Sequence, residues 1–344
     1  MVQKVTDTMT KDSRIEWIDL LKGIAILWLV VYHFYAIGWL RSPVPVFFFL
    51  SGLFFSEGKS FGAFIHKKTK ALIVPFLFFF ALGVGGSVLK NFLTGEAYSF
   101  PQLWRFATLI PADAEKTNPL GVGAIWFLVS LFEIYIIYYA MRKISTKSWW
   151  LLAVAILLFL LSAVTMQFYG NGAIFYLFYT SGFVIYFVTA NLLREKVLFG
   201  KTPAYVLVLA ICAYSVRFVD LSTMLDTCHV GGGILIRIRG MVSMMGLIGV
   251  MVWIGKYLSC IPSVWKTKLF KFILFEGSNS LTILGTHLLV MVVAAIFVKR
   301  FMTVGTVYYI VLFMIIVAAS NICILLFNRY VPFLVNHKSG KKGC

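Results

Sequence analysis

The chain has 344 residues, of which 60% are hydrophobic and only 13% are charged, and its mean hydropathy is +0.91. These values lie far outside the range of soluble globular domains, so we expect an integral membrane protein. The formal net charge is +18. A nucleic-acid-binding protein would need a soluble basic face, and the sequence offers only short basic loops between apolar segments, which excludes that class.

About ten apolar segments approach or exceed the length needed to cross a bilayer, which is about 20 residues. We expect an all-α polytopic membrane protein with spans at 23–40, 43–57, 71–93, 124–141, 149–169, 172–192, 203–220, 232–255, 278–298 and 303–327. The second segment is the shortest, but Pro43 and Pro45 suit a first helical turn, and its closeness to the first span indicates a hairpin. The sequence thus predicts one membrane domain over 1–344, with a cytoplasmic segment 1–22, a transmembrane core 23–327 and a cytoplasmic tail 328–344.

Lysine and arginine concentrate in alternate loops, which predicts the orientation of the spans. The basic stretches are Lys59 to Lys70, Arg142 to Lys147, Arg194 to Lys201, Lys256 to Lys271 and Arg329 to Lys342. Because positive charge favours the cytoplasmic side, we expect these loops and both termini to be cytoplasmic. The expected location is the inner (cytoplasmic) membrane of the cell, in contact with membrane lipids.

The five cysteines are scattered without paired spacing, which indicates neither a disulfide framework nor a zinc site. Cys228 and His229 are adjacent, but two ligands do not make a metal site. We therefore expect no metal ion to take part in the function.

Ionisable side chains recur at helical intervals around the first span. Lys22 and His33 are eleven residues apart, which on an α-helix leaves them on nearly the same face and about 16 Å apart. Asp19 lies on that face as well, and ionisable groups inside a membrane mark functional sites by default. A cation at the membrane surface and an imidazole one leaflet deeper suit the two ends of a long anionic thioester, which is the shape of an acyl-coenzyme A. The alternative for His33, which stands among aromatic residues, is a hydrogen bond to a neighbouring helix.

Two basic residues before the third span form a second candidate group. Lys67 and Lys70 are three residues apart, so they share a face at the cytoplasmic start of that span. Together with Lys22 they would build a phosphate-binding rim that faces the cytoplasm. Their alternative role is to set the membrane topology alone.

Four of the other ionisable residues inside predicted spans are further candidates for the site. Glu133 is in the fourth span, Arg237 and Arg239 are in the eighth, and His287 is in the ninth. Glu133 would contact a substrate or would serve as the counter-ion of one of the arginines in a buried pair that joins helices. Such residues also suit a transporter or a flippase of a lipid-linked saccharide. The sequence shows no repeat relating its halves, which favours an enzyme over that alternative.

Five strings along the chain carry a family resemblance, and they occur in the family's order. They are Asp19-Leu-Leu-Lys22-Gly23-Ile with His33, Pro45-Val-Phe-Phe-Phe-Leu-Ser-Gly52, Lys67-x-x-Lys70, Trp126-Phe127-Leu128 with Leu131, and Gly277-x-Asn279-Ser280-Leu281 with His287. Together they resemble the integral-membrane acyltransferase family 3, whose first-span signature is a basic residue, ten intervening residues and a histidine. The resemblance covers residues 14 to about 330. Lysine replaces the family's frequent arginine in the third-span pair, which keeps the charge but loses bidentate phosphate geometry.

The resemblance implies an O-acyltransferase, most often an O-acetyltransferase, that moves an acyl group from cytoplasmic acyl-CoA to a hydroxyl of a cell-surface or lipid-linked glycan. Acetyl-CoA is then the donor, and Lys22 binds a coenzyme A phosphate. His33 either deprotonates the acceptor hydroxyl as the general base or assists the relay of the acyl group, and the transfer is direct or passes through an acyl-enzyme. Lys67 and Lys70 add charge near the nucleotide, and Asp19 orients Lys22. The remaining candidates, which would contact the acceptor or support the site, are Trp126, Glu133, Arg237, Arg239, Asn279, Ser280 and His287.

Overall fold

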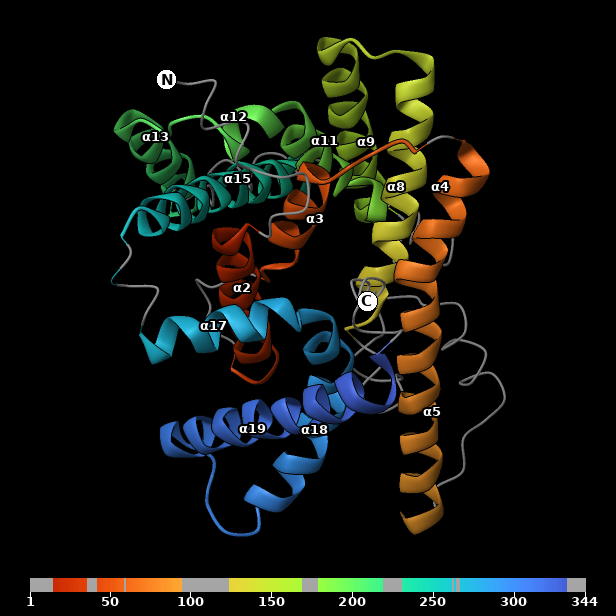
Figure 1. Cartoon of the computed structure of the whole chain (residues 1–344), viewed down its shortest axis with the longest axis vertical. Helices are drawn as coiled ribbons and strands as arrows, with labels where there is room; N and C mark the ends of the chain where they lie inside the picture. Colours follow the sequence, from red (N-terminus) through yellow and green to blue (C-terminus); the bar gives the residue numbers. More distant parts are fainter. Residues whose placement is uncertain are drawn as a thin grey trace, which may run out of the picture.

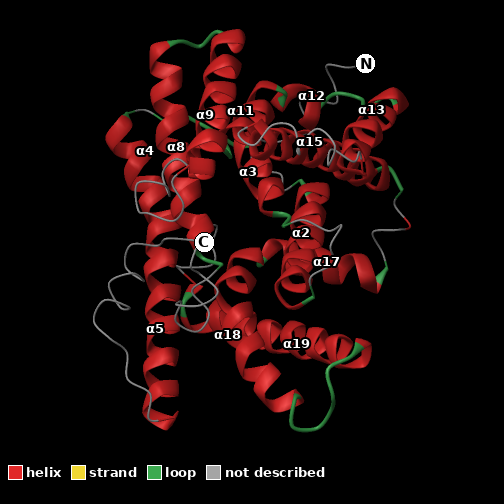
Figure 2. Ribbon diagram, turned by 180° about the vertical axis from the view of Figure 1, so that it is seen from behind, coloured by secondary structure: helices red, strands yellow, loops and turns green. Residues whose placement is uncertain are grey.

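The computed structural model describes residues 15–35, 42–58, 60–94, 124–168, 179–218, 231–261, 263 and 267–332. Within these ranges every regular element is a helix (Figure 2). Six of the helical segments are long and apolar enough to cross a membrane, and two shorter apolar helices accompany them. The structure therefore confirms the predicted all-α polytopic membrane fold.

The described helices follow the predicted spans in order. They are α2 (Glu16–Phe34), α3 (Val44–Leu53), α4 (Phe61–Lys68), the π-helical turn η1 (Thr69–Ile73), α5 (Val74–Thr94), α8 (Trp126–Ile144), α9 (Ser148–Phe168), α11 (Val184–Leu192), α12 (Arg194–Leu198), α13 (Ala204–Ser215), the 3-10 turn η3 (Val216–Phe218), α15 (Gly231–Ser259), α17 (Lys268–Ser278), α18 (Ser280–Val298) and α19 (Thr306–Tyr330). Residues 172–178 of the predicted sixth span lie outside the described residues.

Three features differ from the expectation. The first helix begins at Glu16 rather than at residue 23, so Asp19 and Lys22 lie inside it. The reason is packing, because Trp17, Ile18, Leu20 and Leu21 are already buried. The helix α3 has 10 residues, about 15 Å of helix, and alone is too short to cross a bilayer. The helix α17 was not predicted. It covers Lys268–Ser278, whereas the sequence predicts a basic loop over 256–271 and the start of the next span at residue 278.

Helix α2 occupies the centre of the molecule. It packs against α3, α15, α17, α18 and α19. In Figure 1 it lies between α15 above and α17 to α19 below, while α4, α5 and α8 run along one side. Ten of its 19 residues are buried, among them Ile26 and Leu29. The residues that α2 carries are thereby held in contact with several other helices.

Helices α2 and α17 cross at a pair of glycines. A Cβ atom added at Gly277 would overlap the carbonyl oxygen of Asp19, and one added at Gly23 would overlap the carbonyl oxygen of Ile273. Only glycine allows two helix backbones to approach this closely. The crossing fixes α17 under the N-terminal half of α2, next to Asp19 and Lys22.

Polar contacts join the helix ends on the predicted cytoplasmic side. Glu57, just after α3, accepts hydrogen bonds from Arg142 (2.7 Å) and Lys143 (3.4 Å) at the end of α8. Asn191 of α11 accepts a hydrogen bond from the hydroxyl of Tyr138 at 2.7 Å and donates one to the carbonyl of Gly52 at 3.1 Å. These contacts hold α8 and α11 against the short helix α3.

Candidate active site

Two histidines from different helices meet near the middle of the fold. The rings of His33 on α2 and His287 on α18 have centroids 5.0 Å apart and planes inclined by 60°. In each residue Nδ1 lies within hydrogen-bond distance of the carbonyl oxygen four residues earlier, at 2.8 Å for His33 and 2.7 Å for His287. A carbonyl oxygen only accepts, so Nδ1 of each ring carries a hydrogen, and in the neutral ring the lone pair is on Nε2.

His287 is the more deeply placed of the two histidines. It is 0% exposed, and its Nε2 has no hydrogen-bond partner among the described residues. His33 is only partly buried. Buried polar atoms in native proteins are normally paired, so an orphaned nitrogen marks a functional position or a place for water or ligand.

A cavity of about 320 Å³, here called the inner cavity, is lined by residues of the two helices that carry these histidines and by residues of α3 and α8. Lys22, Ile26 and Leu29 of α2 line it on one side. Continuing this stripe by one helical turn reaches His33. On α18, Ser280 and Leu284 also line the cavity, and the same helical face continues to His287. We infer that both histidines lie beyond one end of the cavity and that Lys22 lies at the other end.

One lysine lines the inner cavity at its predicted cytoplasmic end, and a second contacts another of its lining residues. The ammonium of Lys22, which lines the cavity, is 3.5 Å from a carboxylate oxygen of the buried Asp19. The ammonium of Lys68 lies 3.3 Å from the ring centroid of Tyr135, another cavity-lining residue. Lys67 and Lys70 are exposed and do not line the cavity. Lys68, the lysine of this cluster that contacts Tyr135, was not among the residues predicted from the sequence.

The π-helical turn η1 lies directly beside this lysine cluster. Pro75 has no N–H to donate to the carbonyl of Ala71, as a regular α-helix would require. The chain instead forms wider hydrogen bonds, such as that from the Val74 N–H to the Thr69 carbonyl. Pro75 was therefore a signal in the sequence for an irregular turn at this position. Such π-helical turns are often found at functional sites.

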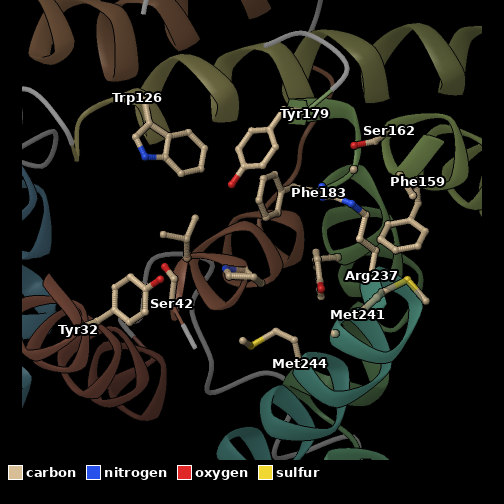
Figure 3. A pocket seen from close by; sticks show the side chains of 16 residues that line it. Tyr32, Ser42, Trp126, Phe159, Ser162, Tyr179, Phe183, Arg237, Met241 and Met244 are labelled. Atoms are coloured by element: carbon tan, nitrogen blue, oxygen red, sulfur yellow. The ribbon is translucent and has the colours of Figure 1, made fainter. Parts of the chain in front are cut away.

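A second cavity of about 380 Å³, here called the outer cavity, is lined by Tyr32, the residue next to His33. Tyr32, Trp126, Tyr179 and Arg237 are among its lining residues (Figure 3). The two cavities share Val44, at the start of α3. Of the in-span candidates, the structure thus brings Trp126 and Arg237 together, whereas Arg239 lines neither cavity.

Glu133 does not pair with the arginines of the eighth span. It lies within hydrogen-bonding reach of Thr180, and its second carboxylate oxygen is buried without a hydrogen-bond partner among the described residues. The alternative of a buried ion pair with Arg237 or Arg239 is therefore not realised. Thr180 in turn contacts Ser130 at 3.0 Å, so Glu133 belongs to a polar contact between α8 and the residues before α11.

The remaining candidates have different roles. Asn279 is buried, donates hydrogen bonds to the Phe275 carbonyl (2.8 Å) and to Ser278 (3.0 Å), and accepts one from Asn328 (3.2 Å), so it joins α17, α18 and α19. Ser280 lines the inner cavity. Glu276, which was not among the predicted residues, is a buried carboxyl within hydrogen-bonding reach of Asn321 on α19.

The fold and the site together define a polytopic membrane protein whose central helix carries Lys22 in the lining of one cavity and His33 one helical turn beyond that lining. Residues 15–326 match the acyltransferase domain of the integral-membrane acyltransferase family 3, and the chain belongs to this family. Comparisons with curated proteins and with solved structures found no match. The protein is therefore a membrane-bound acyltransferase that uses an acyl donor and an acceptor, as the resemblance implied.

Proposed function

We propose that this membrane acyltransferase is an O-acetyltransferase that moves the acetyl group of cytoplasmic acetyl-CoA to a hydroxyl of a cell-surface or lipid-linked saccharide. The inner cavity is the observation that carries the proposal. It has a lysine at one end, an apolar lining along its length and a histidine pair beyond its other end. This order matches the order of groups in an acyl-CoA, with phosphates first, an extended arm next and the thioester last.

The phosphates of the donor would bind at the lysine end of the inner cavity. Lys22 supplies the central charge, and Asp19, 3.5 Å away, orients its ammonium. Lys68 adds a second cation against Tyr135, while the exposed Lys67 and Lys70 add positive charge closer to water. Charge-assisted contacts of this kind bind phosphate more strongly than neutral hydrogen bonds do.

His33 would act as the general base. Because Nδ1 holds its hydrogen in the bond to the Leu29 carbonyl, Nε2 is the nitrogen with a lone pair for the acceptor hydroxyl. As the hydroxyl gives its proton to Nε2, its oxygen attacks the thioester carbonyl and a C–O bond forms. The C–S bond then breaks, and the coenzyme A sulfur takes up the proton from His33. The products are the acetyl ester and free coenzyme A.

His287 would position His33 rather than react itself. Its buried ring contacts the His33 ring edge-on, with centroids 5.0 Å apart, and restricts how that ring turns. A base held in one orientation loses less freedom when the acceptor binds, which lowers the barrier to proton transfer.

The transporter alternative predicts a different dependence on Lys22. A flippase would move a saccharide across the membrane even when Lys22 is replaced, because that movement does not require coenzyme A. Membership of an acyltransferase family favours the enzyme.

The test of this function is transfer of labelled acetyl groups. Purified protein in nanodiscs is incubated with radiolabelled acetyl-CoA and an envelope glycan extract, and wild type is compared with His33→Ala and with His66→Ala, a control at an exposed histidine of α4. We expect label in the glycan with wild type and with His66→Ala, and a loss of at least about a hundredfold with His33→Ala, as is usual when a general base is removed. Equal labelling by all three proteins would remove His33 from the mechanism.

A further inference from the structure

We propose that the outer cavity is the acceptor site and that it selects saccharides bearing an acidic group, which Arg237 binds. This inference rests on the proposed function for the identity of the reaction. It adds the substrate class and the residues that recognise it. The outer cavity is separate from the inner cavity that would hold the donor, and the two meet at Val44.

The position of the outer cavity suits an acceptor. Tyr32 lines it, and the Tyr32 ring contacts the neighbouring His33 ring with centroids 5.8 Å apart. A ligand in the outer cavity would therefore lie beside the general base. Ser42 and Val44 line the same cavity. They lie at the start of α3, whereas Glu57 and its contact with Arg142 lie just after the other end of this helix. The cavity thus belongs to the side of the protein away from Lys22.

The aromatic wall of the outer cavity suits a sugar ring. Trp126, Tyr179 and Phe183 form a cluster whose ring centroids are 5.2 to 6.0 Å apart. Figure 3 shows the Trp126 and Tyr179 side chains side by side at the cavity, with the Tyr179 hydroxyl pointing into it. Aromatic side chains with a polar tip offer an apolar face to a ring and a hydrogen-bonding group at its edge.

Arg237 supplies the charge preference. Its side chain extends from α15 into the cavity, within electrostatic range of Tyr179 (Figure 3). Among the described residues no carboxylate forms an ion pair with Arg237, although it stands within a candidate membrane span. An unpaired guanidinium within a membrane is unfavourable in free energy. The planar arrangement of its N–H donors matches a carboxylate or a phosphate group. An acidic group on the acceptor would supply the missing partner.

The proposal is tested by binding rather than by transfer. Ligand-observed NMR titrations measure the affinity of the purified protein for glucuronic acid, glucose 1-phosphate and glucose. The variants are Arg237→Gln, Arg237→Lys and the control Arg300→Gln, an exposed arginine just after α18. Binding of acetyl-CoA is measured in parallel as a check that the inner cavity is intact.

We expect wild type to bind at least one acidic sugar more tightly than glucose, with the carboxylate and phosphate probes showing which group fits. Arg237→Gln should weaken that binding about tenfold, which is the loss expected for one charge-assisted contact, whereas Arg237→Lys keeps part of it. Arg300→Gln and the binding of acetyl-CoA should not change. Equal affinity of wild type for glucose and both acidic sugars would overturn the proposal, as would undiminished binding by Arg237→Gln or a joint loss of acetyl-CoA binding. Absence of acetyl transfer by wild type would count against the proposed function instead.

Discussion

At the scale of single residues, Lys22 is the residue whose replacement would test the proposed binding of the donor most directly. Its ammonium is part-buried, lies 3.5 Å from Asp19 and lines the inner cavity. Lys68 is fixed differently, because its ammonium lies over the ring of Tyr135 and gains a cation–π contact. Lys22 lines the inner cavity and Lys68 contacts Tyr135, which also lines it, so we propose that both bind one phosphate-bearing ligand.

We predict that Lys22→Ala weakens the binding of acetyl-CoA about tenfold or more, since a hydrogen bond to a charged group contributes about 1.5–3 kcal/mol. The effect should be on the affinity for acetyl-CoA and not on the rate of the saturated enzyme, because Lys22 lies one membrane leaflet from the reacting bonds. Equilibrium binding of labelled acetyl-CoA measures this directly. The matched control is Lys201→Ala, an exposed lysine outside the cavity, which should bind as wild type does. Unchanged binding by Lys22→Ala would contradict the assignment.

The sequence predicted some of the site at this scale and missed other parts. The alignment of Lys22 with His33 on one helical face was predictable, because helix periodicity fixes it within one element. The contact between His33 and His287 was not, since it depends on how α2 and α18 pack. Periodicity likewise gave no way to choose Lys68 over Lys67 and Lys70, because the π-helical turn at Pro75 and the packing against Tyr135 decide which lysine faces inward.

At the scale of helices, the crossing of α2 and α17 supports the lysine end of the inner cavity. The two backbones touch at Gly23 and Gly277, and Asp19 lies at the contact. The sequence did not predict α17 because it is short and starts in a basic stretch, features that resemble a cytoplasmic loop. It is amphipathic, however, and a search for that pattern in the loop would have found it.

We predict that Gly277→Ala destabilises the protein by about 1–3 kcal/mol or more, because the added methyl overlaps the Asp19 carbonyl and forces the helices apart. Thermal unfolding in detergent measures the effect. The matched control is Gly62→Ala in α4, where an added Cβ meets nothing within 4 Å and alanine favours the helix. An unfolding temperature for Gly277→Ala equal to that of wild type would show that α17 does not pack on α2 in this way.

At the scale of the whole molecule, the two cavities are lined by residues from opposite ends of α2. The residues of the inner cavity include Lys22, near the start of α2, whereas those of the outer cavity include Tyr32, near its end. Basic loops predict that the start of α2 faces the cytoplasm. His33 would then stand between a cytoplasmic donor and an acceptor that enters from the opposite side.

The order of the apolar helices followed from hydropathy, because a segment that crosses lipid must be apolar and must satisfy its own backbone. Ten spans were predicted, and the described residues contain six candidate spans and two shorter apolar helices. The two cavities could not be predicted, since each is lined by residues from helices far apart in the sequence, such as Trp126 on α8 and Arg237 on α15. Composition and periodicity describe one helix at a time. The packing of helices decides which of their polar residues meet.

The most direct test of this account is a transfer assay across a sealed membrane. The protein is reconstituted in liposomes with radiolabelled acetyl-CoA trapped inside and the envelope glycan extract supplied only outside, with His33→Ala as the blank. Because acetyl-CoA does not cross the bilayer, labelled glycan outside can arise only through molecules whose Lys22 end faces the lumen. We predict that wild type labels the external glycan and that His33→Ala does not. Labelling that requires donor and glycan in the same compartment would contradict the placement of His33 between two cavities that open on opposite sides.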